Sequence, residues 1–402
     1  MIPVSEAVSI VLKHAIKLNV ESVALSDSLG RVLAEDIIAD CDLPPFDRAQ
    51  MDGYAVRAED VSTPPARLRI VGEAAAGRGW HHEMKAGEAV RIMTGAPVPV
   101  GADAVQQVEL TREVDEAQFV EILQSVEAGR SIVRRASEIK IGETVLRAGE
   151  DINAAMIATL ASFGYGEVKV GCRPRVAIMA TGSELVDVDQ KPGRDQIRDS
   201  NNYTLAAYAK LSGATAERLP LAGDDTEELK RQMAAAAKGS DVLITSGGVS
   251  MGVYDFTKAA LKEMGAEIFF ERVSLRPGKP TVFARLGNTL VFALPGNPVS
   301  VAVTFNLFAR TALRAMQGAK QAELIGETAV LAHDLKGSIE RESYLPAVLR
   351  TDAQGTLLAE PLKWGGSSDF VTFARATALI NVPAGVKMIE AGSQVKIVRL
   401  PE

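Results

Sequence analysis

The segment from Asp241 to Ser300 decides the fold of the middle of the chain. It reads DVLITSGGVSMGVYDF at 241–256, RVSLRPGKPTVFARL at 272–286 and TLVFALPGNPVS at 289–300. Two of these stretches begin with a run rich in Val, Leu, Ile and Phe that ends in a glycine or proline loop, before a helical pattern. Apolar runs with such boundaries are typical of buried strands. We therefore predict strands that end in ligand-accessible loops and continue into helices.

The loops after these strands have two features that bind anions. Backbone N–H groups are unpaired at the start of a helix, and the helix dipole favours negative charge there. Pro298 has a simpler explanation as well, because proline is favoured in the first turn of a helix. The residues expected to form this site are Gly247, Gly248, Ser250, Pro295, Gly296, Asn297, Pro298 and Ser300.

Strand and helix patterns alternate through residues 172–320. Predicted helices at 201–212, 226–239, 255–264 and 299–317 separate the predicted strands. Alternation of elements of this length is typical of a mostly parallel sheet covered by helices on both faces. We therefore predict a doubly wound α/β/α domain over 172–320.

The flanking parts of the chain have a different pattern. Short strands separated by turns fill 46–138 and 321–402, which we interpret as a β-rich domain and a C-terminal β-barrel domain. Residues 1–45 and 139–171 are expected to form an elongated N-terminal or connector domain that is discontinuous in sequence. The predicted fold class is therefore multidomain, α/β plus β.

Composition limits the possible functions. Of 402 residues, 47% are hydrophobic and 24% charged, which predicts a folded chain of several domains. The net charge of −7 argues against nucleic-acid binding. No apolar run approaches the ~20 residues of a membrane span. The two cysteines fit neither a disulfide framework nor a zinc site, so we expect a cytoplasmic protein with free thiols.

Three carboxylates are candidates for a metal site. Ligands of an open α/β sheet bind beyond the carboxyl ends of its strands, and Glu184, Asp224 and Asp255 are placed near that edge. Mg²⁺ takes oxygen ligands and often joins carboxylates to phosphates. A structural role explains some of them alone, because Asp224 with Asp225 can cap the following helix and Glu184 suits a first helical turn. The three together favour Mg²⁺.

Arg272, Arg276 and Lys279 form a run of cations after a strand pattern. Cations on a solvated edge are common and need no further role. Pro277, Gly278 and Pro280 would hold the loop tightly around these charges, however, and this favours an oxyanion clamp. In the β-rich part, Asp52 and Thr94 are ordinary turn residues when considered alone.

Six motifs in order along the chain together resemble one known family. They are MDGYAV (51–56), RIMTGAPVP (91–99), ATGSEL (180–185), SGGVS (246–250), RPGKP (276–280) and LPGNPVS (294–300). The family is that of the molybdopterin molybdenumtransferases, the bacterial MoeA proteins, which are similar to the gephyrin E domain. The resemblance covers essentially the whole chain. It implies an enzyme that hydrolyses adenylylated molybdopterin with Mg²⁺ and molybdate, releases AMP and inserts molybdenum into the dithiolene.

The resemblance also implies a homodimer of four-domain subunits. Its active cleft would lie between the α/β domain of one subunit and the β-rich domain of the other. Position by position, the implied catalytic residues are Asp52, Thr94, Asp224 and Asp255, and the implied metal ligands are Glu184, Asp224 and Asp255. The implied substrate-binding residues are the eight loop residues named above with Arg272, Arg276, Lys279, Arg341 and Ser368. Many members of the family have lysine where this chain has Arg272 and Arg276.

Two other functions are compatible with parts of the sequence. A molybdopterin adenylyltransferase has a similar α/β domain and an SGG-type loop, but it needs none of the long flanking domains found here. A non-catalytic dimeric scaffold would leave the carboxylates without a role. A separate adenylyltransferase is a further expected partner of the molybdenum-inserting enzyme.

Overall fold

The computed structural model describes residues 1–222, 225–248 and 256–401. The chain divides into two compact units. The larger unit contains residues 1–35, 148–157 and 167–402, and the smaller contains 36–147 and 158–166. Three residues of the predicted site, Asp224, Ser250 and Asp255, lie outside the described residues.

The larger unit is built on a sheet of six strands in the order β16-β13-β17-β21-β20-β18. The strands are β13 (Arg175–Ala180), β16 (Thr215–Arg218), β17 (Val242–Ser246), β18 (Glu267–Phe270), β20 (Val282–Leu286) and β21 (Thr289–Leu294). The first four strands of that order run parallel, and β20 runs antiparallel to both of its neighbours. The predicted mostly parallel sheet is therefore confirmed.

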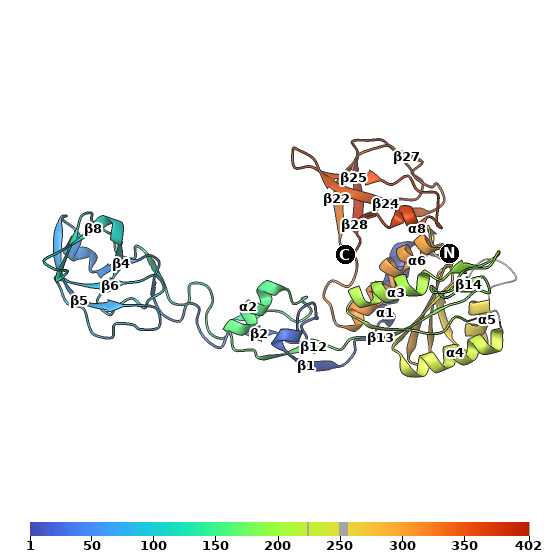
Figure 1. The fold of residues 1–402 in the computed structure, drawn as a ribbon, viewed down its shortest axis with the longest axis horizontal. Coiled ribbons are helices and arrows are strands. Elements are labelled where there is room, and N and C mark those ends of the chain that lie inside the picture. The colour runs from blue at the N-terminus through green and yellow to red at the C-terminus, as the bar shows by residue number, and fades with distance from the viewer. Residues whose placement is uncertain (223–224, 249–255, 402) are drawn as a thin grey trace. The chain divides into compact units, whose positions relative to one another are not determined.

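Helices cover both faces of this sheet (Figure 1). One face packs against α1 (Val4–His14), α3 (Asn201–Leu211), α6 (Pro298–Thr304), the π turn η4 (Phe305–Ala309) and α7 (Arg310–Met316), and the other against α4 (Thr226–Gly239) and α5 (Phe256–Glu263). Alternate strand residues point to opposite layers. Ile178 and Ile244 lie in the first core, whereas Met179 and Leu243 lie in the second. The doubly wound arrangement follows from this alternation.

The N-terminal helix α1 differs from the sequence-based expectation. Residues 1–45 were expected to belong to the connector, but Val4, Ala7 and Val11 are buried in the first core of the α/β sheet. Their spacing of three and four residues forms one apolar face of a helix. That face fits any apolar surface, so the sequence does not say which domain the helix covers. The division of the rest of the chain into four domains stays a prediction.

The C-terminal part of the larger unit is a closed barrel. It consists of β22 (Gly326–Leu331), β24 (Glu342–Thr351), β25 (Leu357–Pro361), β26 (Ala378–Val382) and β28 (Gln394–Arg399). The barrel closes because β24 pairs with both β25 and β26. Buried side chains such as Leu345, Ile380 and Ile397 fill it. A short helix, α8 (Phe370–Phe373), and a two-stranded ladder of β23 (Leu335–Lys336) and β27 (Met388–Ile389) complete this part.

One short strand of the middle segment pairs with the barrel. This strand is β19 (Leu275–Arg276), and it runs parallel to β24, with Leu275 opposite Glu342 and Arg276 opposite Ser343. The sequence pattern does not show this partner. The RPGKP segment is therefore held by the barrel at its start and returns to the α/β sheet at β20.

The smaller unit contains a six-stranded sheet in the order β7-β4-β6-β5-β9-β8. The strands are β4 (Gly53–Val56), β5 (Ala66–Ala74), β6 (Glu88–Ile92), β7 (Ala104–Gln107), β8 (Thr111–Val114) and β9 (Phe119–Ile122). Only β5 and β6 pair in parallel, and apolar clusters cover both faces. The MDGYAV segment enters this sheet as β4, between β6 and β7. The predicted β-rich N-terminal region is confirmed.

The remaining elements are short. They are β1 (Val20–Ala24), η1 (Leu25–Asp27), β2 (Ile37–Ile38), β3 (Arg48–Ala49), η2 (Ala58–Val61), η3 (Val108–Leu110), β10 (Ile132–Val133), β11 (Thr144–Leu146), α2 (Ala154–Ser162), β12 (Glu167–Gly171), β14 (Leu185–Val186) and β15 (Ile197–Arg198). The pairs β1–β12, β2–β11 and β3–β10 are antiparallel. Each joins an early segment to one more than 80 residues later, so these ladders are made of segments that are distant in sequence.

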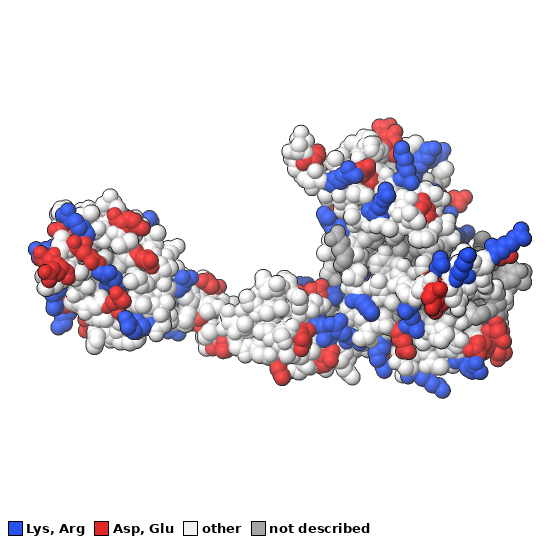
Figure 2. Space-filling model, in the orientation of Figure 1, with Lys and Arg blue, Asp and Glu red and all other residues white. Residues whose placement is uncertain are grey.

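The helices and the charged side chains of the surface have two general features. Within the described ranges, no helix has the length and apolar character that crossing a bilayer requires. On the face drawn in Figure 2, acidic and basic side chains of the described residues are interspersed over both units.

Candidate functional site

Three loops at one edge of the α/β sheet form the base of the site. In the parallel register, Ala180 lies opposite Ser246, and Ser246 lies opposite Leu294. The three strands therefore end at the same level, and the loops at Thr181, Gly247 and Pro295 follow side by side. This is the edge at which the strand-end rule predicts a ligand.

Glycine is required at two positions in the SGGVS motif. Gly247 has φ 92°, and a Cβ there would lie 2.4 Å from the carbonyl oxygen of Thr181. Gly248 has φ 65°, and its Cβ would lie 2.4 Å from Oγ1 of Thr257. Any side chain at these positions would meet both backbone strain and a steric clash. Glycine therefore lets the backbone at 247–248 pass close to Thr181 and to Thr257 in the first turn of α5.

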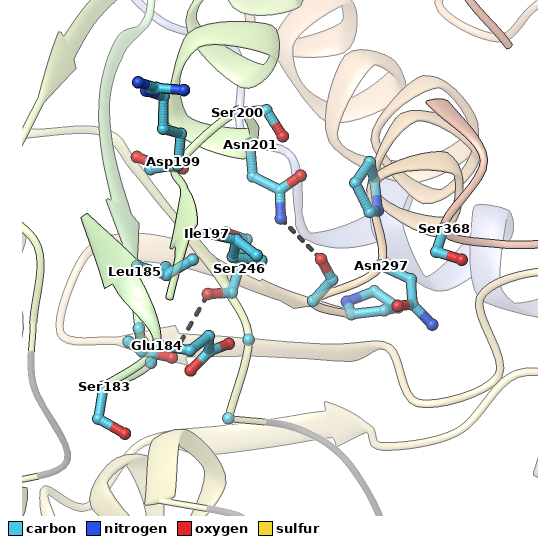
Figure 3. A pocket seen from close by; sticks show the side chains of 18 of the residues that line it. Ser183, Glu184, Leu185, Ile197, Asp199, Ser200, Asn201, Ser246, Asn297 and Ser368 are labelled. Carbon is cyan, nitrogen blue, oxygen red and sulfur yellow. Dashed lines mark hydrogen bonds between the residues drawn. The ribbon is translucent and has the colours of Figure 1, made fainter. Parts of the chain in front are cut away.

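A cavity of about 1120 Å³ lies above these loops. Figure 3 shows Ser183 and Glu184 on one side of it and Asn297 and Ser368 on the other. Its lining residues are Thr181–Leu185, Pro192, Gln196–Asn201, Leu229, Ser246–Gly248, Phe256, Pro280, Pro295–Pro298, Ser368 and Phe370. We call it the larger hollow. Its size and its mixture of polar and apolar walls suit a small organic ligand.

Glu184 is exposed at the wall of the larger hollow. Its carboxylate lies against the backbone of Gly182, because a Cβ on that glycine would be 2.5 Å from Oε2. Within the described part of the chain, this carboxylate has no ion-pair partner, and no three His, Cys, Asp or Glu side chains group as a metal site. The other two predicted Mg²⁺ ligands are among the residues that are not described. Asp225 accepts hydrogen bonds from the N–H groups of Glu227 and Glu228, so it caps α4 as the structural interpretation predicts.

A second cavity, of about 520 Å³, adjoins the first. Its lining residues are Arg276–Pro280, Pro295, Asn297, Ser300, Arg341, Trp364–Ser367. We call it the smaller hollow. It shares Pro280, Pro295 and Asn297 with the larger hollow. Its walls come from the α/β domain and from the barrel, and both contribute cations.

Hydrogen bonds join the two domains around the smaller hollow. Asn297 Nδ2 donates to Ser367 Oγ at 2.9 Å, and the N–H of Val299 donates to the carbonyl of Ser367 at 3.0 Å. Arg341 donates to the carbonyl of Leu275 at 3.3 Å, and Arg276 donates to that of Gly337 at 3.4 Å. Each arginine thus uses one N–H group on the opposite domain. Its remaining donors are available to a ligand.

The two hollows separate charge. Among the described lining residues, the smaller hollow has three cations, Arg276, Lys279 and Arg341, and no carboxylate. The larger hollow has two carboxylates, Glu184 and Asp199, and a single cation among its described lining residues. A small oxyanion fits the first environment. A ligand that arrives with a divalent cation fits the second.

Other predicted residues lie elsewhere. Arg272 is exposed and lines neither hollow, and its carbonyl accepts the N–H of Ile2 at 3.1 Å. Asp52 and Thr94 lie in the smaller unit and contact each other: Oδ1 of Asp52 accepts the backbone N–H of Thr94 at 2.6 Å and its hydroxyl at 2.7 Å. These two hydrogen bonds, the backbone one first, lower the pKa of Asp52. The pair therefore keeps an exposed, ionised carboxylate in a fixed orientation.

Sequence reasoning missed the segment before α3. None of Asp199, Ser200 and Asn201 is among the predicted site residues, yet all three line the larger hollow. Asn201 Nδ2 donates to the carbonyl of Gly296 at 2.8 Å, as the dashed line in Figure 3 shows, and so fixes the LPGNP loop. A helix that follows a strand begins at the same edge where the strand ends. Extending the strand-end rule to helix starts finds this segment.

Asp199 is only 4% exposed although it carries a carboxylate. Burial raises its pKa, and the negative charge of Asp187 acts in the same direction, while N–H groups of Asn202 and Asn201 oppose the rise. A buried carboxylate with a raised pKa beside a cavity is a candidate for a functional role. Ionised Asp199 therefore costs stability at neutral pH.

We expect Asp199→Asn to stabilise the protein at pH 7. The amide oxygen can still accept the N–H of Asn202, which is 3.1 Å away, but no charge is buried. The folded-state pKa lies above the unfolded value, so the cost grows as pH rises through the folded pKa and vanishes near the ordinary aspartate pKa of about 3.9. Thermal unfolding followed by circular dichroism should show a higher midpoint for the variant than for the wild type at pH 7, and a smaller difference near pH 4. Equal destabilisation at pH 7 and pH 4 would contradict this account, and Asp189→Asn is the exposed control.

The fold and the paired hollows define a multidomain α/β protein in which a cation-lined hollow adjoins a larger hollow of a size that suits a small organic ligand. Comparison with known families agrees. Residues 2–164 match the MoeA N-terminal region (domain I and II), residues 177–315 a probable molybdopterin binding domain, and residues 328–400 the MoeA C-terminal region (domain IV).

Whole-chain relatives extend this agreement. A molybdopterin molybdenumtransferase of Bacillus subtilis (strain 168) is 36% identical over 407 residues, covering 100% of this chain and 94% of that protein. One from Nostoc sp. is 37% identical over 392 residues, covering 95% and 89%. The structure of a molybdopterin biosynthesis moeA protein from Pyrococcus horikoshii OT3 matches with a TM-score of 0.86 at 28% identity, covering 100% of both chains. The chain belongs to the molybdopterin molybdenumtransferase (MoeA) family.

Proposed function

We propose that this protein inserts molybdenum into molybdopterin. It takes adenylylated molybdopterin and molybdate, hydrolyses the phosphoanhydride in the presence of Mg²⁺, releases AMP and leaves molybdenum on the dithiolene. The observation that carries the proposal is the pair of adjoining hollows with opposite charge character. Two ligands of different size and charge must meet in this reaction, and the shared wall at Pro280, Pro295 and Asn297 brings two sites together.

The larger hollow is the proposed site of the pterin nucleotide. Gly247 and Gly248 line it without side chains, and Asn201 donates to the carbonyl of Gly296 in the adjoining loop. Glu184, with Asp224 and Asp255, would hold Mg²⁺. These donors are all carboxylate oxygens, which fits a hard cation, and the Glu184 carboxylate is exposed at the hollow. When bound, Mg²⁺ would polarise phosphorus and neutralise charge on the leaving AMP.

The smaller hollow is the proposed molybdate site. Arg276, Lys279 and Arg341 supply positive charge, and Ser300 supplies a hydroxyl at its wall. Charge-assisted hydrogen bonds from such groups are the strong ones for an oxyanion. Ser368 lies on the other side of the shared wall, in the larger hollow, so it is proposed to contact the pterin side rather than the molybdate.

We propose that Asp52 and Thr94 act in the site of a second copy of the chain. The hydrogen bonds between them keep an ionised carboxylate exposed, as a group that acts on a ligand of another subunit requires. The protein would then be a homodimer, as the family resemblance implies. The two cysteines, Cys41 and Cys172, are free thiols, which suits the reducing cytoplasm in which we place the enzyme.

The test of the proposed function is an AMP-release assay. Purified protein is given adenylylated molybdopterin, Mg²⁺ and molybdate, and AMP is measured by chromatography. We expect AMP release that needs both substrates and the metal. Consumption of ATP with free molybdopterin would instead indicate an adenylyltransferase, and absence of pterin-nucleotide binding would indicate a scaffold.

A substitution in the smaller hollow tests, in the same assay, whether molybdate binds there. Lys279→Gln removes one of three cations and is expected to raise the molybdate concentration at half-maximal rate by about tenfold. Arg272→Gln is the matched control, because that arginine lies close in sequence but lines neither hollow. Equal effects of the two substitutions would contradict the assignment of the molybdate site.

A further inference from the structure

The larger hollow has a shortage of positive charge for the ligand proposed to bind there. Its described lining residues include Glu184 and Asp199 but only one cation, Arg198. The three cations Arg276, Lys279 and Arg341 line the smaller hollow instead. A ligand with a diphosphate group brings several negative charges into the larger hollow, and a single divalent cation held by carboxylates does not balance them. This observation makes Arg198 the side chain to consider.

Arg198 is held at a fixed place relative to Glu184. The two strands β14 and β15 run parallel, with Leu185 opposite Ile197 and Val186 opposite Arg198. The N–H of Ile197 donates to the carbonyl of Glu184 at 2.8 Å, and the N–H of Asp199 donates to that of Val186 at 2.9 Å. Backbone hydrogen bonds on both sides of Arg198 thus connect it to the segment that carries the proposed metal ligand.

The guanidinium of Arg198 has hydrogen-bond donors that no described residue uses. Its Nε donates to the carbonyl of Gln190 at 3.0 Å, which orients the side chain. Among the described residues no carboxylate forms an ion pair with it, although Asp187, Asp189 and Asp195 are close in sequence. Two terminal amino groups therefore remain, and a planar fork of this kind matches two phosphate oxygens at once.

We propose that Arg198 binds the diphosphate of the nucleotide ligand in the larger hollow. This assignment rests on the proposed function and adds a substrate-binding residue to it. The carboxylate of Glu184 and the guanidinium of Arg198 then act on the same anionic group, one through a divalent cation and the other directly. Arg198 contributes to binding of the ligand before any bond breaks, so its loss raises KM more than it lowers kcat.

The segment between β14 and β15, which we call the arm, supplies a matched control. Residues 187–196 lie between β14 and β15 and carry two further cations, Lys191 and Arg194, which are exposed and do not line the hollow. Basic side chains project from the surface in this region, near the end of the larger unit where β14 lies (Figures 1 and 2). General attraction of anions by the arm depends on all of these charges equally. A specific contact depends on Arg198 alone.

The experiment measures ADP and adenosine binding by isothermal titration calorimetry, in the presence of Mg²⁺. Wild type, Arg198→Gln, Arg198→Lys and Arg194→Gln are compared. We expect ADP binding to weaken about tenfold or more in Arg198→Gln and by a smaller factor in Arg198→Lys, which keeps the charge but loses the fork. Adenosine binding should be unchanged in every variant, and Arg194→Gln should behave as wild type. Circular dichroism checks that each variant is folded.

Several outcomes overturn the inference. They are ADP affinity of Arg198→Gln within twofold of wild type, an equal loss in Arg194→Gln, an equal loss of adenosine binding, and a wild-type protein that does not bind ADP. The AMP-release assay separates this inference from the proposed function. Normal AMP release with an unchanged KM in Arg198→Gln rejects the role of Arg198 alone. A selective loss of ADP binding in that variant, together with no molybdate-dependent AMP release by the wild-type protein, rejects the proposed function and keeps the diphosphate site.

Discussion

Replacing Glu184 by Gln is expected to slow Mg²⁺-dependent AMP release by about a hundredfold or more, because metal stabilisation of a developing charge contributes several kcal/mol. Gln keeps the size of the side chain and its place against Gly182, but it removes the negative charge that a hard cation requires. Asp255→Asn is expected to abolish the same activity. The rate is measured at saturating pterin nucleotide and molybdate over a range of Mg²⁺ concentrations.

The Mg²⁺ titration distinguishes a metal ligand from a structural residue. A weakened metal site shifts the half-maximal Mg²⁺ concentration upward, and added metal restores part of the rate. Asp189→Asn is the control, since Asp189 is an exposed carboxylate of the neighbouring arm that does not line the hollow. Wild-type rates for Glu184→Gln at low Mg²⁺ would rule out the proposed role.

Mixing two inactive variants is expected to restore activity. If each active site combines Asp52 of one subunit with Glu184 of the other, a dimer of one Asp52→Asn subunit and one Glu184→Gln subunit has one site with both residues intact. Random reassortment of subunits makes half of the dimers mixed, so about a quarter of the wild-type sites are recovered. Each variant alone should be nearly inactive. The rate of AMP release is measured before and after subunit exchange.

The opposite arrangement predicts a different result. If Asp52 and Glu184 act in the site of the same subunit, every subunit in the mixture lacks one of them, and activity stays at the level of the single variants. A double variant carrying both substitutions, mixed with wild type, gives the second control. Its mixed dimers contain one altered residue in each shared site, so the added variant lowers activity below that of the wild-type protein diluted alone.

Local patterns predict much of this fold because they reflect short-range physics. The apolar runs before Gly247 and Pro295 become buried parallel strands, and Asp225 caps α4 through two backbone N–H groups. The strand-end rule then places Thr181, Gly247, Gly248 and Gly296 around one cavity. Each of these results needs only the chain direction of strands and the chemistry of a few neighbouring residues.

Long-range pairing explains what could not be predicted. Nothing in the apolar face of α1 says that it covers the α/β sheet, and nothing in Leu275–Arg276 says that the strand pairs with the barrel. These partners depend on the relative stability of alternative contacts over the whole chain. For the same reason the sequence grouped Arg272 with Arg276 and Lys279, although the structure places only the latter two at the smaller hollow.

The hydrogen bond between Asn297 and Ser367 and the pairing of β19 with β24 have a mechanical consequence. Of the described walls of the larger hollow, only Ser368 and Phe370 come from beyond residue 320, whereas Arg341 and Trp364–Ser367 of the smaller hollow all do. A small rotation of the barrel against the α/β sheet would therefore reshape the smaller hollow and leave most of the larger one unchanged.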